Sequence, residues 1–198
     1  MKNKSQQFTK KIISGKFKGR LLKVPSKTTT RSSKTIVIES FFNTLQFDII
    51  DANFVELFSG SGCIGLEALS RGAKNIFFME KDRDALKILK TNITSLDTKS
   101  CKVYEGDSFI NIDTVVSQLK KIKEQAYFYI DPPFSIRDGM EEIYDKTMNL
   151  IASLPKEQVK MIIIEHMTGL EVSDELGPYK KIKSKKFGNT SLTYLHSE

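Results

Sequence analysis

The sequence has 198 residues, of which 39% are hydrophobic and 28% charged, and its formal net charge is +7. This composition is typical of one globular domain, and no apolar run approaches the roughly 18 residues of a membrane span. Two cysteines are too few for a zinc site, and the N-terminal residues lack the apolar stretch of a signal peptide. We therefore expect a reduced, cytoplasmic protein, a monomer that needs neither metal nor membrane.

The excess of positive charge lies in residues 1–40. This segment contains eleven Lys or Arg and one acid, Glu39, whereas the rest of the chain carries 20 bases and 23 acids. A localised basic segment is typical of proteins that bind a phosphate backbone, although a solvated tail would carry the same charge. Apolar residues are interspersed among the charges, and Gly15 and Gly19 interrupt them. The segment is therefore predicted to form short strands that clasp a ligand.

A helix is predicted over residues 35–47, and from residue 53 onward short apolar runs alternate with helical patterns. The expected strands cover 54–58, 75–79, 102–104, 127–130 and 161–164, and the expected helices cover 65–71, 84–95, 112–122 and 140–151. Several of the strands are apolar throughout, as parallel strands with helices on both faces are. Residues 179–185 and 190–196 predict a closing antiparallel hairpin. The fold class is therefore α/β, with a doubly wound, mostly parallel sheet.

A glycine-rich loop follows the first of these strands. Gly60, Gly62 and Gly65 match G-x-G-x-x-G between a strand and a helix, where a ligand must approach the backbone closely. Glu80 lies 20 residues after Gly60, at the end of the second strand, where a carboxylate can accept hydrogen bonds from ribose hydroxyls. The pattern predicts an adenosine-containing cofactor. An acid near the loop, Glu56, suits the sulfonium of S-adenosylmethionine (SAM) better than the pyrophosphate of NAD(P), although an ordinary residue near a strand end would fit the same position.

Two further carboxylates end predicted strands, so they should meet at the same sheet edge. Asp107 follows the third strand and could accept a hydrogen bond from an adenine amino group or cap the next helix. Asp131 follows the fourth strand, in the run Asp131-Pro132-Pro133-Phe134. Its carboxylate and the fixed carbonyl of Pro132 could accept both N–H bonds of an exocyclic amine and direct the nitrogen lone pair at a methyl group. Phe134 could stack on a base turned out of its helix. The run therefore predicts methyl transfer to an amine.

The motifs ELFSGSGCIGLEALSRGA, FFMEKD, EGD and YIDPPF resemble those of Rossmann-like class I SAM-dependent methyltransferases. The segments ISGKFKGRLLKVP, RSSKTIVIESFFNTL and KKFGNTSLTYL extend the resemblance over nearly the whole chain, to the RsmD family. That family methylates N2 of a guanine in 16S ribosomal RNA. The resemblance implies a seven-stranded sheet, a methyltransferase domain over residues 35–198 and a basic RNA-binding extension over residues 1–34. It also implies 16S rRNA or a small-subunit assembly intermediate as the partner.

The resemblance also implies a role for each matching residue. The catalytic loop would consist of Asp131, Pro132, Pro133 and Phe134. The cofactor would contact Glu56, Phe58, Gly60, Ser61, Gly62, Gly65, Glu80, Lys81, Asp107 and Ser108. The RNA would contact Lys16, Lys18, Arg20, Arg31 and Lys34. The chain departs from the family pattern at four positions. Glu56 stands where the family usually has Asp, Ser32 stands where the family has Pro, and Ile36 and Ile38 stand where the family has basic residues.

Three other functions fit parts of the sequence. The same loop chemistry suits N6 of adenine in DNA or RNA, and only the N-terminal resemblance separates the two amines. An NAD-dependent oxidoreductase would use the glycine loop, but its candidate catalytic histidines are limited to His166 and His196. His166 follows the fifth strand, where a histidine more often has a structural role. An RNA-binding protein without catalytic activity would not need the Asp-Pro-Pro-Phe run.

Overall fold

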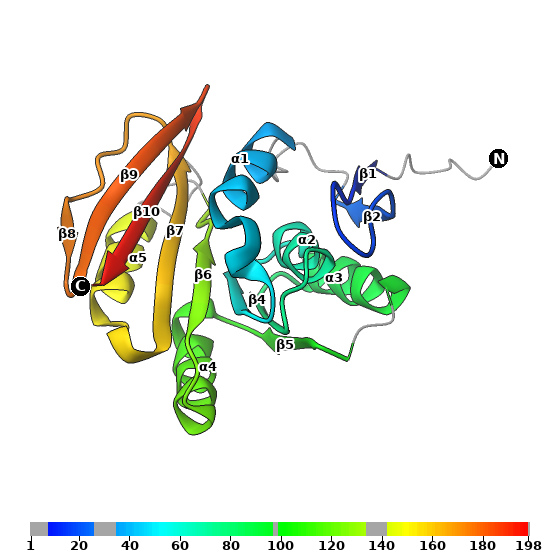
Figure 1. The fold of residues 1–198 in the computed structure, drawn as a ribbon, viewed down its shortest axis with the longest axis horizontal. Coiled ribbons are helices and arrows are strands. Elements are labelled where there is room, and N and C mark those ends of the chain that lie inside the picture. The colour runs from blue at the N-terminus through cyan, green and yellow to red at the C-terminus, as the bar shows by residue number, and fades with distance from the viewer. Residues whose placement is uncertain (1–7, 26–34, 97–98, 134–141, 198) are drawn as a thin grey trace.

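The computed structural model describes residues 8–25, 35–96, 99–133 and 142–197. Within these residues the centre is an eight-stranded sheet of order β5-β4-β3-β6-β7-β10-β9-β8 (Figure 1). The five apolar runs are all strands and lie parallel to one another, as predicted. The strands of the sheet are β3 (Asn53–Leu57), β4 (Asn75–Glu80), β5 (Cys101–Glu105), β6 (Ala126–Ile130), β7 (Val159–Met167), β8 (Glu175–Leu176), β9 (Tyr179–Phe187) and β10 (Thr190–Ser197).

The sheet has one strand more than the predicted seven. The additional strand, β8, is two residues long, and its Glu175 and Leu176 pair with Lys180 and Tyr179 of β9. Two residues are too few for an alternating pattern, which is why the sequence does not reveal this strand. The predicted closing hairpin is confirmed as β9 and β10, and β10 pairs antiparallel with β7.

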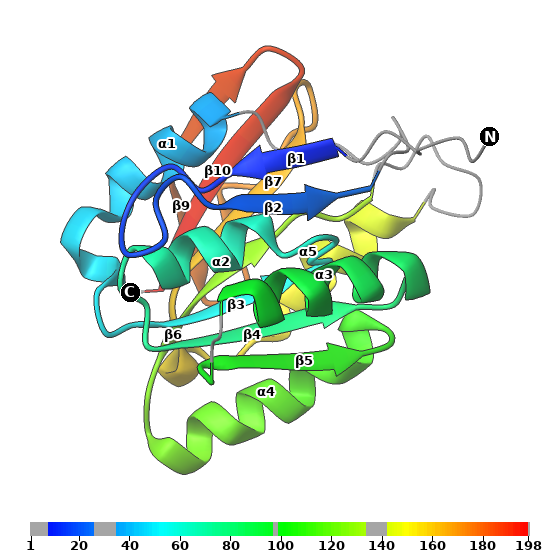
Figure 2. The same cartoon turned by 90° about the vertical axis from the view of Figure 1, so that its right-hand side faces the viewer.

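Helices cover both faces of the sheet, which explains why its central strands are apolar on both sides (Figure 2). Phe54 packs in a cluster with α1, α2 and α3, whereas the next residue, Val55, packs in a second cluster with α4 and α5. The predicted helix over 35–47 ends at Leu45 and passes into a short 3-10 turn. The helical elements are α1 (Thr35–Leu45), η1 (Gln46–Ile49), α2 (Cys63–Ser70), α3 (Arg83–Leu96), α4 (Ser108–Ile122), α5 (Ile143–Ser153) and η2 (Lys156–Gln158).

The basic N-terminal segment contains an antiparallel hairpin that packs on the domain. Its backbone docks on α2, because Ile13 N and Ser14 N donate to the Glu67 carboxylate at 2.8 and 3.1 Å. Ile12 and Leu22 are buried in the same apolar cluster as α1, α2 and α3. The described part of the segment is therefore no solvated tail. The two strands of this hairpin are β1 (Phe8–Lys11) and β2 (Leu21–Val24).

Candidate active site

The carboxyl ends of β3, β4 and β6 meet at one edge of the sheet. β3 and β6 pair in register, with Leu57 opposite Ile130. Phe58, which begins the glycine loop, and Asp131 therefore leave the sheet at the same level, one strand spacing or about 4.8 Å apart. Glu80 ends β4, on the other side of β3. In open α/β sheets, ligands bind in the crevice outside this edge.

The three glycines of the loop serve different purposes. A Cβ on Gly62 would lie 2.3 Å from Leu89 Cδ1, and a Cβ on Gly65 would lie 2.5 Å from a ring carbon of Phe78. These two glycines allow α2 to pack closely against β4 and α3. Gly60 has a positive φ of +54°, and a Cβ there would meet no atom within 4 Å. Gly60 is therefore the position at which the loop leaves room for a ligand.

Backbone strain marks the start of the same loop. Phe58 has φ +56°, in the left-handed region that costs a residue with a side chain about 1–2 kcal/mol. Phe58 N donates to Ser108 Oγ at 3.4 Å, and its ring meets that of Phe109 edge-on with centroids 5.5 Å apart. The start of α4 thus holds the glycine loop in its turn. Ser61 O accepts a hydrogen bond from Asn92 Nδ2 of α3 at 2.9 Å.

Glu80 fastens the loop to the end of β4. Its Oε2 accepts from Gly60 N at 2.6 Å, and its Oε1 accepts from Lys81 N at 2.8 Å and Asp82 N at 2.7 Å. The side chain is buried, with 8% of the residue exposed. Because a carboxylate has about four acceptor sites, three amide bonds leave one for a ribose hydroxyl. Lys81 contributes its backbone amide to this arrangement.

Glu56 is buried beneath the glycine loop. Its Oε2 accepts from Gly65 N at 2.8 Å, which ties β3 to the first turn of α2. Burial raises the pKa of this carboxyl to about 8, although the charge of Lys10 on β1 opposes the shift. Glu56 is therefore mainly protonated at neutral pH. A cation in the crevice would favour its ionised form.

Asp107 caps α4, the second of the two roles considered for it. Its Oδ1 accepts from Phe109 N at 2.8 Å, and its side chain is exposed. Ser108, the next residue, is buried. A cap of this kind leaves the other carboxylate oxygen accessible, so contact with an adenine amino group remains a prediction.

The run that is expected to be catalytic begins directly after β6. Asp131 and Pro133 are half-buried and Pro132 is buried. Consecutive prolines restrict φ to about −65° at both positions, which limits the directions in which the Pro132 carbonyl can point. Phe134 lies outside the described residues, so its stacking on a base stays a prediction.

A hydrogen bond that the sequence analysis missed supports this strand end. Tyr129 Oη donates to Glu165 Oε2 across 2.5 Å, and both side chains are buried. Ile164 pairs with Ile130, so Glu165 and Asp131 stand at the same level on adjacent strands. The bond fixes β6 against β7 beside the Asp-Pro-Pro turn. The only signal in the sequence is a glutamate within an apolar run, MIIIEHM.

His166 has a structural role, as its position after the fifth apolar run suggested. Its Nδ1 lies 2.9 Å from Met167 O, which can only accept, so Nδ1 carries the proton. Nε2 therefore accepts from Thr193 Oγ1, also at 2.9 Å. Burial lowers the pKa of the imidazole. A neutral histidine with both nitrogens engaged is not available for hydride chemistry.

Comparison with known proteins identifies the family. A family model described as "Conserved hypothetical protein 95" matches residues 10–196. Ribosomal RNA small subunit methyltransferase D of Escherichia coli is 34% identical over 141 residues, which are 71% of this chain and 66% of that protein. The chain belongs to the RsmD family of methyltransferases.

Two further known proteins are similar to this RsmD-family chain over nearly its whole length. YlbH of Bacillus subtilis is 29% identical over 184 residues, which are 92% of this chain and 96% of that protein. The solved structure of yhhF from Escherichia coli superposes with a TM-score of 0.75 at 27% identity, and the match covers 96% of this chain and 99% of that chain. The predicted family and the predicted α/β methyltransferase fold are therefore confirmed, and the family favours a methyltransferase over an NAD-dependent oxidoreductase.

Three of the expected RNA-binding residues of this RsmD-family protein lie in the loop between β1 and β2. Lys16 Nζ stands 5.3 Å from the ring centroid of Phe17. Arg20 Nη2 donates to Ser95 O of α3 at 2.7 Å, so part of its guanidinium serves to dock the hairpin. The other two expected residues, Arg31 and Lys34, lie outside the described residues.

Lys18 lines a hollow of about 520 Å³ between the hairpin and the start of α1. Lys11 and Thr35 contribute to the same hollow. Its positive charge fits the predicted contact with RNA, which remains a prediction.

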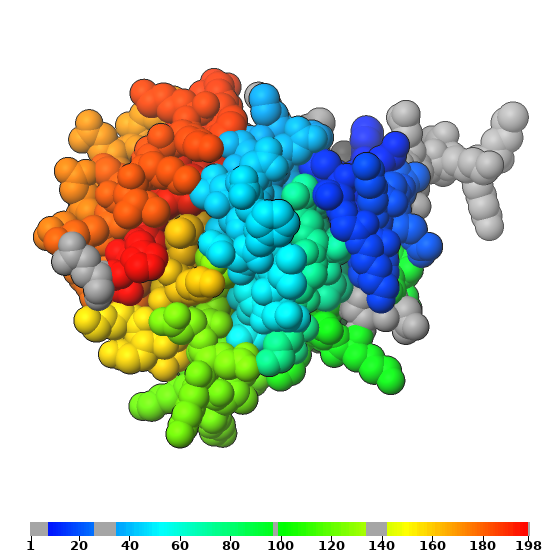
Figure 3. All heavy atoms as spheres, viewed as in Figure 1, coloured from blue at the N-terminus to red at the C-terminus, as the bar shows by residue number. Residues whose placement is uncertain are grey.

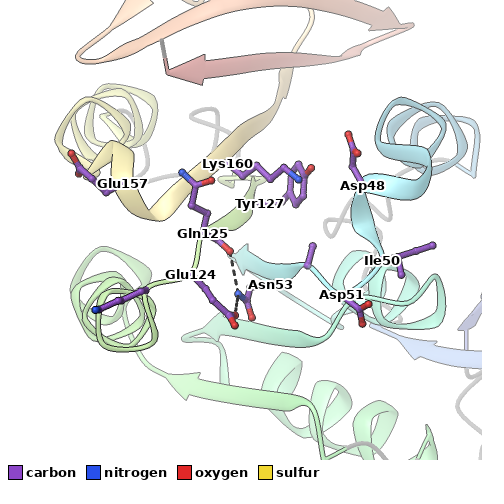
Figure 4. Close-up of a pocket in the computed structure, with 11 residues that line it drawn as sticks. Asp48, Ile50, Asp51, Asn53, Glu124, Gln125, Tyr127, Glu157 and Lys160 are labelled. Carbon is purple, nitrogen blue, oxygen red and sulfur yellow. Dashed lines mark hydrogen bonds between the residues drawn. The ribbon is translucent and has the colours of Figure 1, made fainter.

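A second hollow, of about 530 Å³, lies at the opposite edge of the sheet, where β3 and β6 begin (Figure 4). Asn53 Nδ2 donates there to Glu124 Oε2 at 2.7 Å and to Gln125 O at 3.1 Å. The expected site residues that the structure describes do not line it, and its four carboxylates outnumber its two lysines, so a phosphate backbone would be repelled. The four acids that line it are Asp48, Asp51, Glu124 and Glu157.

Two features are absent from residues 8–25, 35–96, 99–133 and 142–197. No helix in these ranges is long and apolar enough to cross a membrane. No cluster of three or more His, Cys, Asp or Glu side chains in them could hold a metal ion.

Proposed function

We propose that this RsmD-family protein transfers a methyl group from SAM to the N2 amine of a guanine in 16S rRNA. The observation that carries the proposal is the register of β3 and β6, because it brings Asp131 and the glycine loop to one level of one sheet edge. An acceptor amine held by Asp131 would then lie beside a ligand that rests on Gly60.

The residues present fit SAM. Gly60 offers open space where a ligand can approach the backbone, and Glu80 keeps an acceptor site for a ribose hydroxyl. Asp107 has an exposed carboxylate at the end of β5. When bound, SAM supplies an electrophilic methyl group on a positively charged sulfur.

The contribution of Asp131 follows from the chemistry of an exocyclic amine. The nitrogen lone pair of such an amine is delocalised into the base, so the amine is a weak nucleophile. Acceptors at the Asp131 carboxylate and the Pro132 carbonyl would favour a pyramidal nitrogen and stabilise the positive charge that develops on it. With SAM bound, the nitrogen lone pair held in this way would form the new N–C bond, the electrons of the S–C bond would stay on sulfur, and the amine would release its proton to water.

Guanine N2 of small-subunit rRNA is the preferred target because of the family. The Escherichia coli relative is named for methylation of the small ribosomal subunit RNA. The Lys11 and Lys18 hollow beside α1 supports a polyanionic substrate.

Nucleoside analysis tests the proposal. Small-subunit rRNA and assembly particles from a strain that lacks the protein are incubated with it and SAM, digested and analysed by mass spectrometry. We expect N2-methylguanosine with the wild type and its loss with Asp131→Ala, while calorimetry shows SAM binding by both. Undiminished methylation by Asp131→Ala would refute the catalytic role.

N6-methyladenosine in RNA or DNA is the second candidate product. The same two acceptors suit that amine, so the Asp-Pro-Pro geometry supports it equally. Its appearance in the digest without N2-methylguanosine would replace the first candidate by the second.

A further inference from the structure

Two lysines of β9 project onto the face of the sheet that α1 covers. Lys183 pairs with Tyr194 and Lys185 with Leu192, and paired residues of antiparallel strands share a face. Tyr194 and Leu192 belong to the apolar cluster that contains α1. Lys183 and Lys185 therefore stand beside that helix.

Two uncharged hydroxyl groups of α1 contact the ammonium groups of these lysines. Lys185 Nζ donates to Ser40 Oγ at 3.3 Å, and Lys183 Nζ lies 3.5 Å from Thr44 Oγ1. Lys183 Nζ is also 4.6 Å from the ring centroid of Tyr194. Hydroxyls and a ring fix the positions of the two ammonium groups, and none of these three partners carries a negative charge.

Lys181 of the same strand differs in this respect. A bulge next to Leu195 turns Lys181 to the other face, where its Nζ forms an ion pair with Asp174. Within the part of the chain that the structure describes, no carboxylate lies within 4.0 Å of Lys183 or Lys185. Partial burial, reinforced by the charge of Lys185, lowers the pKa of Lys183. A bound anion would relieve this repulsion.

The lysine pair lies level with the catalytic strand end. Lys185 pairs with Leu192, Leu192 pairs with Glu165, and Glu165 stands level with Asp131. Three strand spacings separate β9 from β6, or about 14 Å. Two lysines at positions i and i+2 of a strand are about 6.7 Å apart, which suits neighbouring phosphates of one nucleic acid strand.

Lys183 and Lys185 also lie on the same side of the molecule as the N-terminal hairpin, β1 and β2. In Figure 3 the N-terminal hairpin, α1 and the β9–β10 hairpin lie side by side on the surface that faces the viewer. Lys11 and Lys18 line the hollow on one side of α1, and Lys183 and Lys185 flank its other side. A polyanion that crosses α1 would meet positive charge at both ends.

We propose that Lys183 and Lys185 bind phosphate groups of the RNA substrate, a few nucleotides from the base that enters the active site. Ser40 and Thr44 orient the two ammonium groups, and the surface across α1 connects them to the N-terminal hairpin. This inference rests on the proposed RNA substrate and adds a contact surface to it. An RNA strand fits better than a free nucleotide because the positive groups lie on two separate elements, the N-terminal hairpin and β9, on either side of α1.

The test compares two double variants of equal charge change. Lys183→Gln/Lys185→Gln removes the pair, and Lys120→Gln/Lys121→Gln removes two exposed lysines at the end of α4 that points away from the active-site edge. Filter binding to an unmodified 16S rRNA transcript is measured between about 0.05 and 0.3 M salt. We expect the first variant to bind about tenfold more weakly at 0.1 M salt and its log Kd–log salt slope to fall by about 1.4, since each lost phosphate contact on a single strand removes about 0.7. The control should match the wild type.

Three further measurements separate the possible outcomes. Lys183→Arg/Lys185→Arg keeps both charges and should retain wild-type affinity even if the Gln variant proves unstable. SAM affinity should be the same in all variants. A Gln variant with wild-type Kd and slope overturns this inference alone, whereas a wild type that methylates no rRNA overturns the proposed function.

Discussion

Gly60 N donates to Glu80 Oε2 across 2.6 Å, and this bond closes the glycine loop onto the end of β4. The two residues are 20 positions apart, and Glu80 also holds the amides of Lys81 and Asp82. One carboxylate thus shapes the loop, and we expect its remaining acceptor site to meet a cofactor.

Replacing Glu80 should weaken SAM binding. Glu80→Ala removes the acceptor for a ribose hydroxyl and releases the loop, and bonds to a charged group contribute about 1.5–3 kcal/mol each. We expect the Kd for SAM, measured by calorimetry, to rise about ten- to a hundredfold. Glu175→Ala is the matched control, because Glu175 is exposed on β8, at the opposite end of the strand order from β5. Equal SAM affinity in Glu80→Ala and the control would contradict this role.

Two glycine substitutions should separate the packing of the loop from its contact with a ligand. Gly62→Ala places a methyl group 2.3 Å from Leu89 Cδ1, so it should lower the free energy of unfolding by about 2–4 kcal/mol. Gly60→Ala meets no neighbouring atom and should cost about 1–2 kcal/mol from its left-handed φ alone. Urea denaturation measures both. SAM binding should suffer at Gly60→Ala, since its methyl group enters the space left for the ligand, and unimpaired binding would show that the ligand does not rest there.

The buried carboxyl of Glu56 should make stability depend on pH. Its pKa is raised from an ordinary 4.5 to about 8, so the folded state binds a proton that the unfolded state has lost. The free energy of unfolding should therefore fall as pH rises from 4.5 to 8, by up to about 1.4 kcal/mol per pH unit. Urea denaturation at several pH values in this window measures the slope. Glu56→Gln, which can still accept from Gly65 N, should flatten it, and an unchanged slope would assign the dependence to another group.

Glu67 should control how firmly the N-terminal hairpin is docked. Its carboxylate accepts from Ile13 N, Ser14 N and Arg71 Nε, and it is buried. Glu67→Ala leaves those donors without their acceptor, at a cost of about 2–4 kcal/mol. Hydrogen exchange should accelerate at residues 8–24 more than in the central sheet.

Asp84→Asn serves as the control for Glu67→Ala. It disrupts an exposed ion pair with Lys87 and should change stability by less than about 0.5 kcal/mol. If exchange in the hairpin were equally slow in both variants, docking would depend on Ile12 and Leu22 rather than on Glu67.

The sequence alone determined the parallel strands, the glycine loop and the carboxylates at strand ends. Apolar runs bounded by turns are local features, and the 20-residue interval from Gly60 to Glu80 reflects one strand–helix–strand unit. Asp131 could be recognised for the same reason, since a carboxylate and two prolines end an apolar run. The family followed from motifs that are themselves local.

The tertiary structure decided what each of these residues does. Gly62 and Gly65 proved to be packing positions and Gly60 the open one, because Leu89 and Phe78 approach only the first two. The docking of the hairpin on Glu67 joins residues more than 50 positions apart, and the alignment of Lys185 with Asp131 requires the register of four strands. Burial and strand register arise when distant segments pack together, and no short stretch of sequence carries that information.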